Sequence, residues 1–172
     1  MYELHENEQY FFTEETIDEL TRFLGGYSPV CCLCAPSLGK RLSENGHDVH
    51  ILDIDKRFEN CKGFHYWDIN RPEWTGRKYE MIICDPPFFN ISLSRLFAAI
   101  RLLAQNDFQQ PIMVSYLERR AENIIGTFAK FNLQRTEYFA QYQTVQRCGR
   151  NDIRFFSNRT DAVNEGLVLH LS

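Results

Sequence analysis

Short, continuous apolar runs constrain the fold of this chain more than any other feature. Residues 30–35 and 81–84 carry almost no polar side chain. Strands with one face in water alternate apolar and polar residues, whereas continuous apolar runs are typical of strands covered on both faces, as in parallel sheets. Both runs therefore predict central strands of a covered, mostly parallel sheet.

The rest of the sequence alternates helical and extended segments. Thr13 predicts the N-cap of a helix that runs to about Leu24, where two glycines follow. Helical spacing of apolar residues predicts further helices around residues 38–45, 93–103 and 121–131. Extended segments are predicted at residues 49–54, 64–67, 80–84, 111–116, 134–144 and 153–157.

This order of segments predicts an α/β fold with a doubly wound sheet, closed by an antiparallel hairpin formed by the last two extended segments. We expect Pro36-Ser37 to form the turn after the first strand. The chain has 172 residues, 44% of them hydrophobic, which is enough for one well-buried core. We therefore expect a single domain over residues 1–172, with a tail at 159–172.

Charge and composition exclude several classes of protein. The net charge of −4 gives no overall positive field that would attract nucleic acid, although a local basic patch would still do so. No leader and no apolar run of roughly 20 residues is visible, so we expect a soluble, cytoplasmic protein that does not bind a membrane. The six cysteines lack paired metal-ligand spacing, and we expect reduced core thiols and no metal.

The strongest chemical signal is Asp85-Pro86-Pro87-Phe88, which follows directly on the apolar strand 81–84. Consecutive prolines lack N–H donors and make a rigid loop whose carbonyls are free to face a ligand. The Asp85 carboxylate and the Pro86 carbonyl would accept hydrogen bonds from an amine that attacks an electrophilic methyl sulfonium. Phe88 and Phe89 would stack on a planar base or enclose the apolar stem of a lysine.

Two further aspartates follow predicted strands and are candidates for binding a nucleoside. Asp53 ends the second strand, where a carboxylate can accept hydrogen bonds from both ribose hydroxyls. Asp68 is placed to accept one from an adenine amino group, and Ile54 or Ile69 would pack on the ring. The turn Ala35-Pro36-Ser37 replaces the glycine-rich motif of dinucleotide enzymes, which argues for a cofactor without phosphates.

Four motifs together resemble one methyltransferase family. They are Gln9-Tyr10-Phe11-Phe12-Thr13-Glu14-Glu15-Thr16, Ala35-Pro36-Ser37, Leu52-Asp53-Ile54-Asp55-Lys56-Arg57-Phe58 and Asp85-Pro86-Pro87-Phe88. Over roughly residues 9–158 the chain resembles the "probable N6-adenine methyltransferase" family, which includes elongation-factor lysine methyltransferases and the zinc-knuckle ribosomal-RNA adenine methyltransferase. Unlike the latter, it has no zinc knuckles and no added nucleic-acid domain.

The resemblance implies a Rossmann-like class I methyltransferase that binds S-adenosylmethionine at Ala35, Asp53 and Asp68. It also implies that the N-terminal helical segment, residues 1–28, caps the cofactor side, with its aromatic part before the first helix placed over the cofactor or the acceptor. That assigns Gln9, Phe11 and Phe12 to closing over the cofactor or the acceptor.

Three functions follow as hypotheses. The first is methylation of the N6 amine of adenine in RNA or DNA, with Arg147, Arg150 and Arg154 near phosphate. The second is methylation of a protein lysine, which fits the acidic charge and needs a group that removes a proton. The third is a non-catalytic partner subunit with the same fold. The acceptor, the position methylated, the oligomeric state and the need for an adaptor protein are not predicted.

Overall fold

A single seven-stranded sheet organises the structure, which is a computed structural model that describes residues 1–159. The predicted tail at 159–172 lies outside the described residues except for Arg159. The strand order is β3-β2-β1-β4-β5-β7-β6. The strands are β1 (Val30–Leu33), β2 (Val49–Asp53), β3 (Phe64–Tyr66), β4 (Met81–Cys84), β5 (Ile112–Leu117), β6 (Gln134–Phe139) and β7 (Ile153–Ser157).

The sheet is mostly parallel, as the apolar runs predicted. β1 pairs in parallel with both β2 and β4, and every residue of β1 and of β4 is buried. β7 runs antiparallel to both β5 and β6, so the predicted closing hairpin is confirmed. The fold is therefore the doubly wound α/β sheet with an antiparallel end that the sequence predicted.

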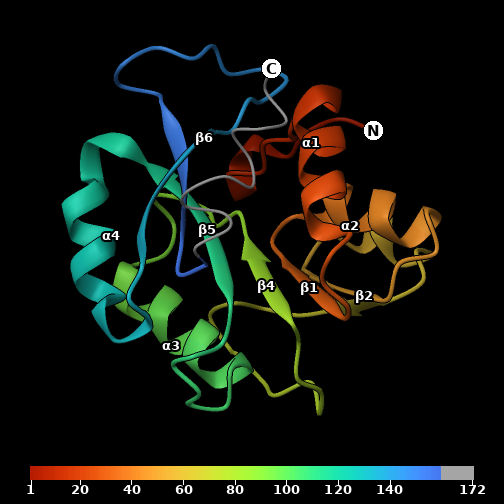
Figure 1. Cartoon of the computed structure of the whole chain (residues 1–172). Coiled ribbons are helices and arrows are strands. Elements are labelled where there is room, and N and C mark those ends of the chain that lie inside the picture. The colour runs from red at the N-terminus through yellow and green to blue at the C-terminus, as the bar shows by residue number, and fades with distance from the viewer. Residues whose placement is uncertain (160–172) are drawn as a thin grey trace.

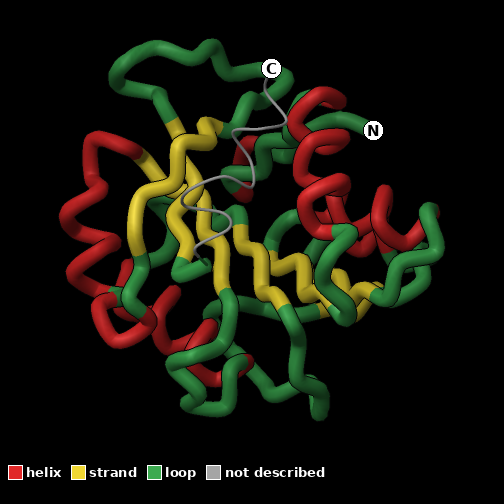
Figure 2. Tube along the Cα trace, in the orientation of Figure 1, coloured by secondary structure: helices red, strands yellow, loops and turns green. Residues whose placement is uncertain are grey.

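Four α-helices flank the sheet in two pairs (Figures 1 and 2). α1 (Glu14–Leu24) packs on α2 (Pro36–Glu44), which in turn contacts β1 and β2. α3 (Leu93–Leu103) packs on α4 (Ala121–Thr127), which contacts β5. Short 3-10 turns are found at His5–Asn7, Lys56–Phe58, Glu118–Arg120 and Ala129–Phe131.

Local signals set most of the helix boundaries. The Thr13 side chain accepts a hydrogen bond from the Thr16 N–H, so the predicted N-cap of α1 is confirmed. Pro36 is not in a turn before α2 but is its first residue, where a proline costs no hydrogen bond. The helix expected through Phe131 stops at Thr127 and continues as a separate 3-10 turn.

The strand order reverses between β1 and β4, and this places a crevice at their carboxyl ends. The N-terminal segment reaches this edge, because Phe12 forms a β-bridge with Tyr142. The Thr13 N–H also donates to the Gln141 carbonyl at 2.9 Å. The first residues, the ends of β1 and β4, and the segment after β6 therefore meet at one place. No helix of the described part of the chain is long and apolar enough to cross a bilayer.

Candidate active site

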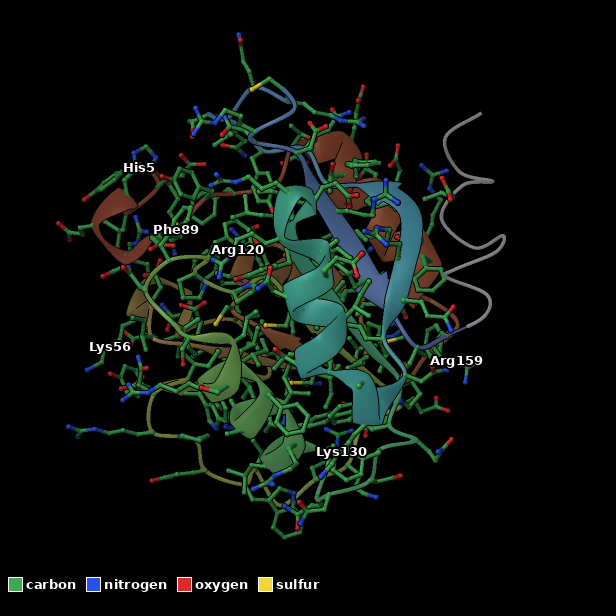
Figure 3. All side chains as sticks on the ribbon, turned by 90° about the vertical axis from the view of Figure 1, so that its left-hand side faces the viewer. His5, Lys56, Phe89, Arg120, Lys130 and Arg159 are labelled. Atoms are coloured by element: carbon green, nitrogen blue, oxygen red, sulfur yellow. The ribbon has the colours of Figure 1, made fainter. Side chains whose placement is uncertain are left out.

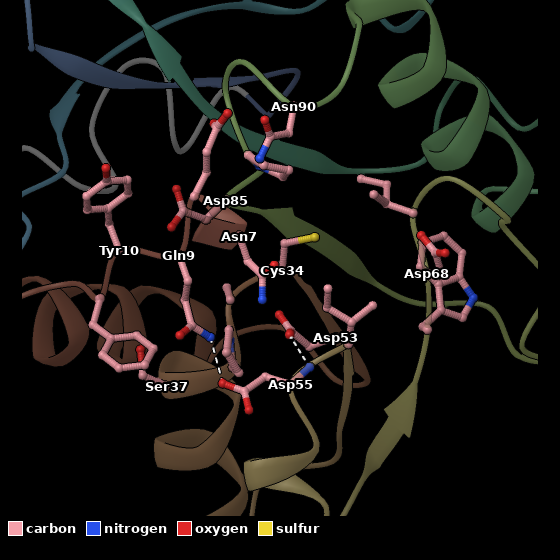
Figure 4. Close-up of a pocket in the computed structure, with 18 of the residues that line it drawn as sticks. Asn7, Gln9, Tyr10, Cys34, Ser37, Asp53, Asp55, Asp68, Asp85 and Asn90 are labelled. Carbon is pink, nitrogen blue, oxygen red and sulfur yellow. Dashed lines mark hydrogen bonds between the residues drawn. The ribbon is translucent and has the colours of Figure 1, made fainter. Parts of the chain in front are cut away.

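Two neighbouring pockets open at the carboxyl edge of the sheet. Pocket A contains residues from the ends of β1, β2 and β4 and from the N-terminal segment (Figure 4). It is lined by Asn7, Glu8, Gln9, Tyr10, Phe11, Phe12, Cys34, Ala35, Pro36, Ser37, Asp53, Ile54, Asp55, Trp67, Asp68, Ile69, Asn70, Asp85, Pro87 and Asn90. Pocket B is lined by His5, Tyr10, Phe88, Phe89, Leu117, Arg119, Tyr142, Thr144, Val145, Gln146, Asn151 and Ile153.

All seven residues predicted to bind the cofactor line pocket A. They are Ala35, Pro36, Ser37, Asp53, Ile54, Asp68 and Ile69. They meet because the parallel strands β1 and β2 end side by side, and the loop after β3 follows at the same edge. Their individual roles stay predictions, but the structure brings them together.

Asp53 and Asp55 differ in how they are engaged. Asp53 Oδ1 accepts the Asp55 N–H at 2.8 Å, and burial raises the pKa of Asp53 to about 6. Asp55 accepts hydrogen bonds from Arg57 and from Gln9 Nε2, at 2.7 Å in each case. Burial opposes ionisation of Asp55, but these hydrogen bonds outweigh it and lower the pKa. Asp55 is thus committed to its protein partners, which supports Asp53 as the ribose ligand.

The Asp68 side chain both accepts a hydrogen bond within its own loop and lines pocket A. Its Oδ1 accepts the Asn70 N–H at 2.9 Å, as expected for an aspartate that caps the start of a loop. Its side chain also lines pocket A next to Trp67 and Ile69. The capping contact fixes the carboxylate at the rim of the pocket.

Pocket A is rich in acidic side chains. Five carboxylates line it, namely Glu8, Asp53, Asp55, Asp68 and Asp85, whereas no Lys, Arg or His of the described chain does. A negative pocket favours a cationic ligand and disfavours phosphate groups. These residues fit S-adenosylmethionine, which carries a sulfonium and an ammonium group and no phosphate.

The N-terminal segment contributes to both pockets: residues 7–12 line pocket A, and His5 and Tyr10 line pocket B. Gln9, Phe11 and Phe12 all line pocket A. Gln9 is held to Asp55 and, through its Oε1, by Arg57 at 2.9 Å. Of the two roles that the resemblance left open for these three residues, the structure therefore favours closing over the cofactor.

Asp85 links the two pockets, since it lines pocket A and is hydrogen-bonded to a residue of pocket B. Its Oδ1 accepts hydrogen bonds from Ser115 Oγ at 2.6 Å and from the Tyr142 hydroxyl at 2.7 Å. Asp85 lines pocket A, and Tyr142 lines pocket B. Burial raises the pKa of Asp85 to about 7, although both hydrogen bonds act to lower it. Asp85 therefore changes protonation state near neutral pH.

The other residues of the proline loop divide between the pockets. Pro87 lines pocket A, whereas Phe88 and Phe89 line pocket B. Phe88 is only 8% exposed and packs edge-on against Tyr116, while Phe89 is 65% exposed. Pro86 is buried and lines neither pocket. Figure 3 shows Phe89 and His5 on the same side of the molecule.

The arginines proposed for phosphate contact line neither pocket. Arg154 Nε pairs with Glu118 at 3.0 Å, and Arg147 Nε pairs with Asp152 at 3.3 Å. Both guanidinium groups also lie over the ring of Phe139. Arg150 is exposed in the turn before β7. The sequence analysis missed Arg119, which does line pocket B.

Ser115 and Tyr142 were also missed. A serine inside the apolar run of β5 was a usable signal, because a buried hydroxyl needs a partner. Tyr142 gave no such signal, since it follows a strand in an irregular segment and meets Asp85 only in the folded chain.

Solved structures with the same fold are methyltransferases. The magnesium protoporphyrin IX methyltransferase of Synechocystis, with bound S-adenosylmethionine, superposes with a TM-score of 0.57 at 18% identity, covering 83% of this chain and 77% of that one. The N-methyltransferase NodS of Bradyrhizobium japonicum gives 0.56 at 14% identity, covering 84% and 93%. The chain thus has the fold of class I methyltransferases, and the first of these neighbours binds S-adenosylmethionine.

Sequence comparison gives the family. The family described as "Probable N6-adenine methyltransferase" matches residues 3–160, and the chain belongs to it. A protein-lysine N-methyltransferase of Drosophila melanogaster is 35% identical over 80 residues, covering 42% of this chain and 35% of that protein. The EEF1A lysine methyltransferase 1 of Danio rerio is 26% identical over 98 residues, covering 48% and 59%. The matched stretches thus span only part of either relative.

Proposed function

We propose that the protein transfers a methyl group from S-adenosylmethionine to the side-chain amine of a protein lysine. The observation that carries this proposal is Asp85, a carboxylate of pocket A that is hydrogen-bonded to Tyr142 of pocket B and whose pKa is raised to about 7. A lysine is protonated at neutral pH, so it must lose a proton before its nitrogen can attack. The exocyclic amine of adenine is already neutral and needs no such base.

Pocket A is the proposed cofactor site. Asp53 accepts hydrogen bonds from the ribose hydroxyls, Asp68 from the adenine amino group, and Ile54 and Ile69 pack on the ring. The negative charge of the pocket favours the cationic cofactor over its neutral-sulfur product, which helps product release. The N-terminal segment covers the bound cofactor and excludes water from it.

Pocket B is the proposed acceptor site. Apolar and aromatic side chains supply much of its lining, among them Phe88, Phe89, Leu117 and Val145. Such a lining suits the four-carbon stem of a lysine, while the amine reaches Asp85 at the inner end. Hydrogen bonds to Asp85 and to the Pro86 carbonyl orient the nitrogen lone pair for attack.

The reaction balances with Asp85 as the proton acceptor. The lysine ammonium gives a proton to Asp85, and the neutral nitrogen becomes the nucleophile. Bound S-adenosylmethionine supplies the methyl group: the N–C bond forms as the C–S bond breaks, and the sulfur keeps the electron pair. Asp85 then passes its proton to solvent, which restores the carboxylate.

The two curated relatives, both named lysine methyltransferases, support the same acceptor. Arg147 and Arg154, two of the three arginines expected near phosphate, are paired with carboxylates instead, which disfavours a nucleic acid. Methylation of adenine is the competing function, favoured by the name of the family and by Arg119 in pocket B.

The experiment that separates these acceptors uses methyl-labelled S-adenosylmethionine and an extract that lacks this activity. Product is divided between nuclease and protease. We expect the label to survive nuclease and to be released by protease. Label released by nuclease would replace lysine by adenine as the acceptor, and no label in either fraction would favour the non-catalytic subunit.

A further inference from the structure

Among the described residues, the hydrogen-bond donors to the Asp85 carboxylate all reach the same one of its two oxygens. Ser115 and Tyr142 both donate to Oδ1, and no described residue donates to Oδ2. A carboxylate oxygen has two acceptor sites, so these donors fill Oδ1. We propose that Tyr142 and Ser115 are positioning residues that fix Oδ1 of Asp85 and leave Oδ2 for the acceptor amine.

Each donor is itself held in place by the fold. Ser115 follows Val114, which pairs with Cys84 across β4 and β5, so register places its hydroxyl beside Asp85. The Tyr142 ring packs on Phe12 with centroids 5.1 Å apart, and the same two residues form the β-bridge. The Asp85 carboxylate is therefore held both by Ser115 on the neighbouring strand and by Tyr142, which is distant in the sequence.

The two donors also keep Asp85 ionisable near neutral pH. Burial favours the neutral acid, and the nearby charge of Asp53 acts in the same direction. The neighbouring Cys84 thiol, whose own pKa is raised by burial, contributes no positive charge that would stabilise the Asp85 carboxylate. Hydrogen bonds to a carboxylate favour its charged form, so loss of either donor raises the pKa of Asp85. The inference uses the proposed function only to identify the amine.

The test is a titration of Asp85 that needs no methyl transfer. The full chain is labelled with aspartate carrying ¹³C at the carboxyl carbon, and the Asp85 signal is assigned by its loss in Asp85→Asn. Tyr142→Phe keeps the ring on Phe12 and removes one oxygen. We expect it to raise the pKa of Asp85 by about one unit, and Ser115→Ala to act in the same direction.

Tyr138→Phe is the matched control. Tyr138 is also a buried tyrosine whose hydroxyl donates to a carboxylate, that of Glu19, at 2.6 Å. Its loss should lower stability in a similar way and leave the pKa of Asp85 unchanged. An unchanged pKa in both Tyr142→Phe and Ser115→Ala, or an equal shift in Tyr138→Phe, would overturn the inference.

The second readout is the pH dependence of transfer to whichever acceptor is found. A rise of one unit from about 7 lowers the ionised fraction at pH 7 by about fivefold, and the difference disappears near pH 9. Affinity for S-adenosylmethionine should not change. If the pKa of Asp85 shifts in these variants but the wild-type protein methylates neither lysine nor adenine, the proposed function is refuted and this inference still holds. A Tyr142→Phe rate loss that persists unchanged at pH 9, without a pKa shift, would refute the inference alone.

Discussion

The backbone N–H of Phe89 donates to Glu8 Oε2 at 2.8 Å, although the two residues are 81 positions apart in the chain. Glu8 lines pocket A, and Phe89 lines pocket B. This hydrogen bond joins the cover of the proposed cofactor site to the loop that carries Asp85. The segment that lines pocket A is thereby tied directly to the loop that lines pocket B.

Removal of this contact should weaken catalysis more than it weakens the fold. We expect Glu8→Ala to lower kcat/KM by up to about tenfold, since one hydrogen bond to a charged group is lost at an exposed position. Glu8→Gln keeps an acceptor oxygen and should stay close to wild type. Glu6→Ala, a change in an exposed neighbour, is the site control. Equal losses in Glu8→Gln and Glu8→Ala would show that charge, rather than the hydrogen bond, matters.

Asp53→Ala should act mainly on the cofactor. Loss of the carboxylate removes the proposed ribose contacts, and we expect the Kd for S-adenosylmethionine to rise about ten- to hundredfold. Isothermal titration calorimetry measures this directly. Asp48→Ala changes a surface aspartate that pairs with Arg77 just before the start of β2, at the opposite end of the strand from Asp53, and serves as the control. Unchanged affinity in Asp53→Ala would remove Asp53 from the site.

Asp85→Asn should abolish transfer and stabilise the protein above neutral pH. The pKa of Asp85 is about 7 in the folded chain, against about 3.9 when unfolded. As pH rises from about 4 to 7 the unfolded state releases this proton first, so the free energy of unfolding falls. The Asp85→Asn variant does not show this fall in the free energy of unfolding, because asparagine does not ionise. Its amide oxygen still accepts hydrogen bonds from Ser115 and Tyr142.

Urea unfolding at pH 5 and pH 8 checks this prediction. The stability advantage of Asp85→Asn over wild type should be larger at pH 8, on the order of a few kcal/mol at most. Asp53, whose pKa is also raised, titrates in both proteins, and loss of the neighbouring Asp85 charge lowers its pKa, which adds to the advantage of the variant at pH 8. An advantage that is equal at the two pH values would mean that Asp85 has an ordinary pKa.

Two helical glycines test the packing of the sheet. A Cβ on Gly39 would lie 2.7 Å from Cγ1 of Ile51, whereas one on Gly126 would meet nothing within 4 Å. Gly39→Ala should therefore destabilise by about 1–3 kcal/mol through overpacking. Gly126→Ala should be neutral or stabilise by up to about 1 kcal/mol. Thermal unfolding of both variants measures the difference, and a neutral Gly39→Ala would show that α2 can move away from β2.

The sequence predicted the fold well because its signals are local. Apolar runs identified β1 and β4, and Thr13 identified the start of α1. The end of α4 was wrong, since the apolar spacing continues through Phe131 while the backbone turns at Phe128. Residues next to a strand end, such as Asp53, were found by position alone.

The parts of the site that depend on long-range contacts were not predictable in this way. Tyr142 reaches Asp85 only because the segment after β6 bridges to Phe12. The ion pair between Arg154 and Glu118 joins β7 to the turn that follows β5, and no sequence pattern predicts it. Two of the three arginines that look available for phosphate in the sequence, Arg147 and Arg154, are thus paired with carboxylates in the fold.

The most direct test of the central claim is the chemical identity of the methylated product. Wild type and Asp85→Asn are incubated with methyl-labelled S-adenosylmethionine and an acceptor extract, and the products are hydrolysed and separated by mass. We expect label in Nε-methyl-lysine with wild type and none with Asp85→Asn. Label in N6-methyladenine, or methyl-lysine that persists in Asp85→Asn, would contradict it.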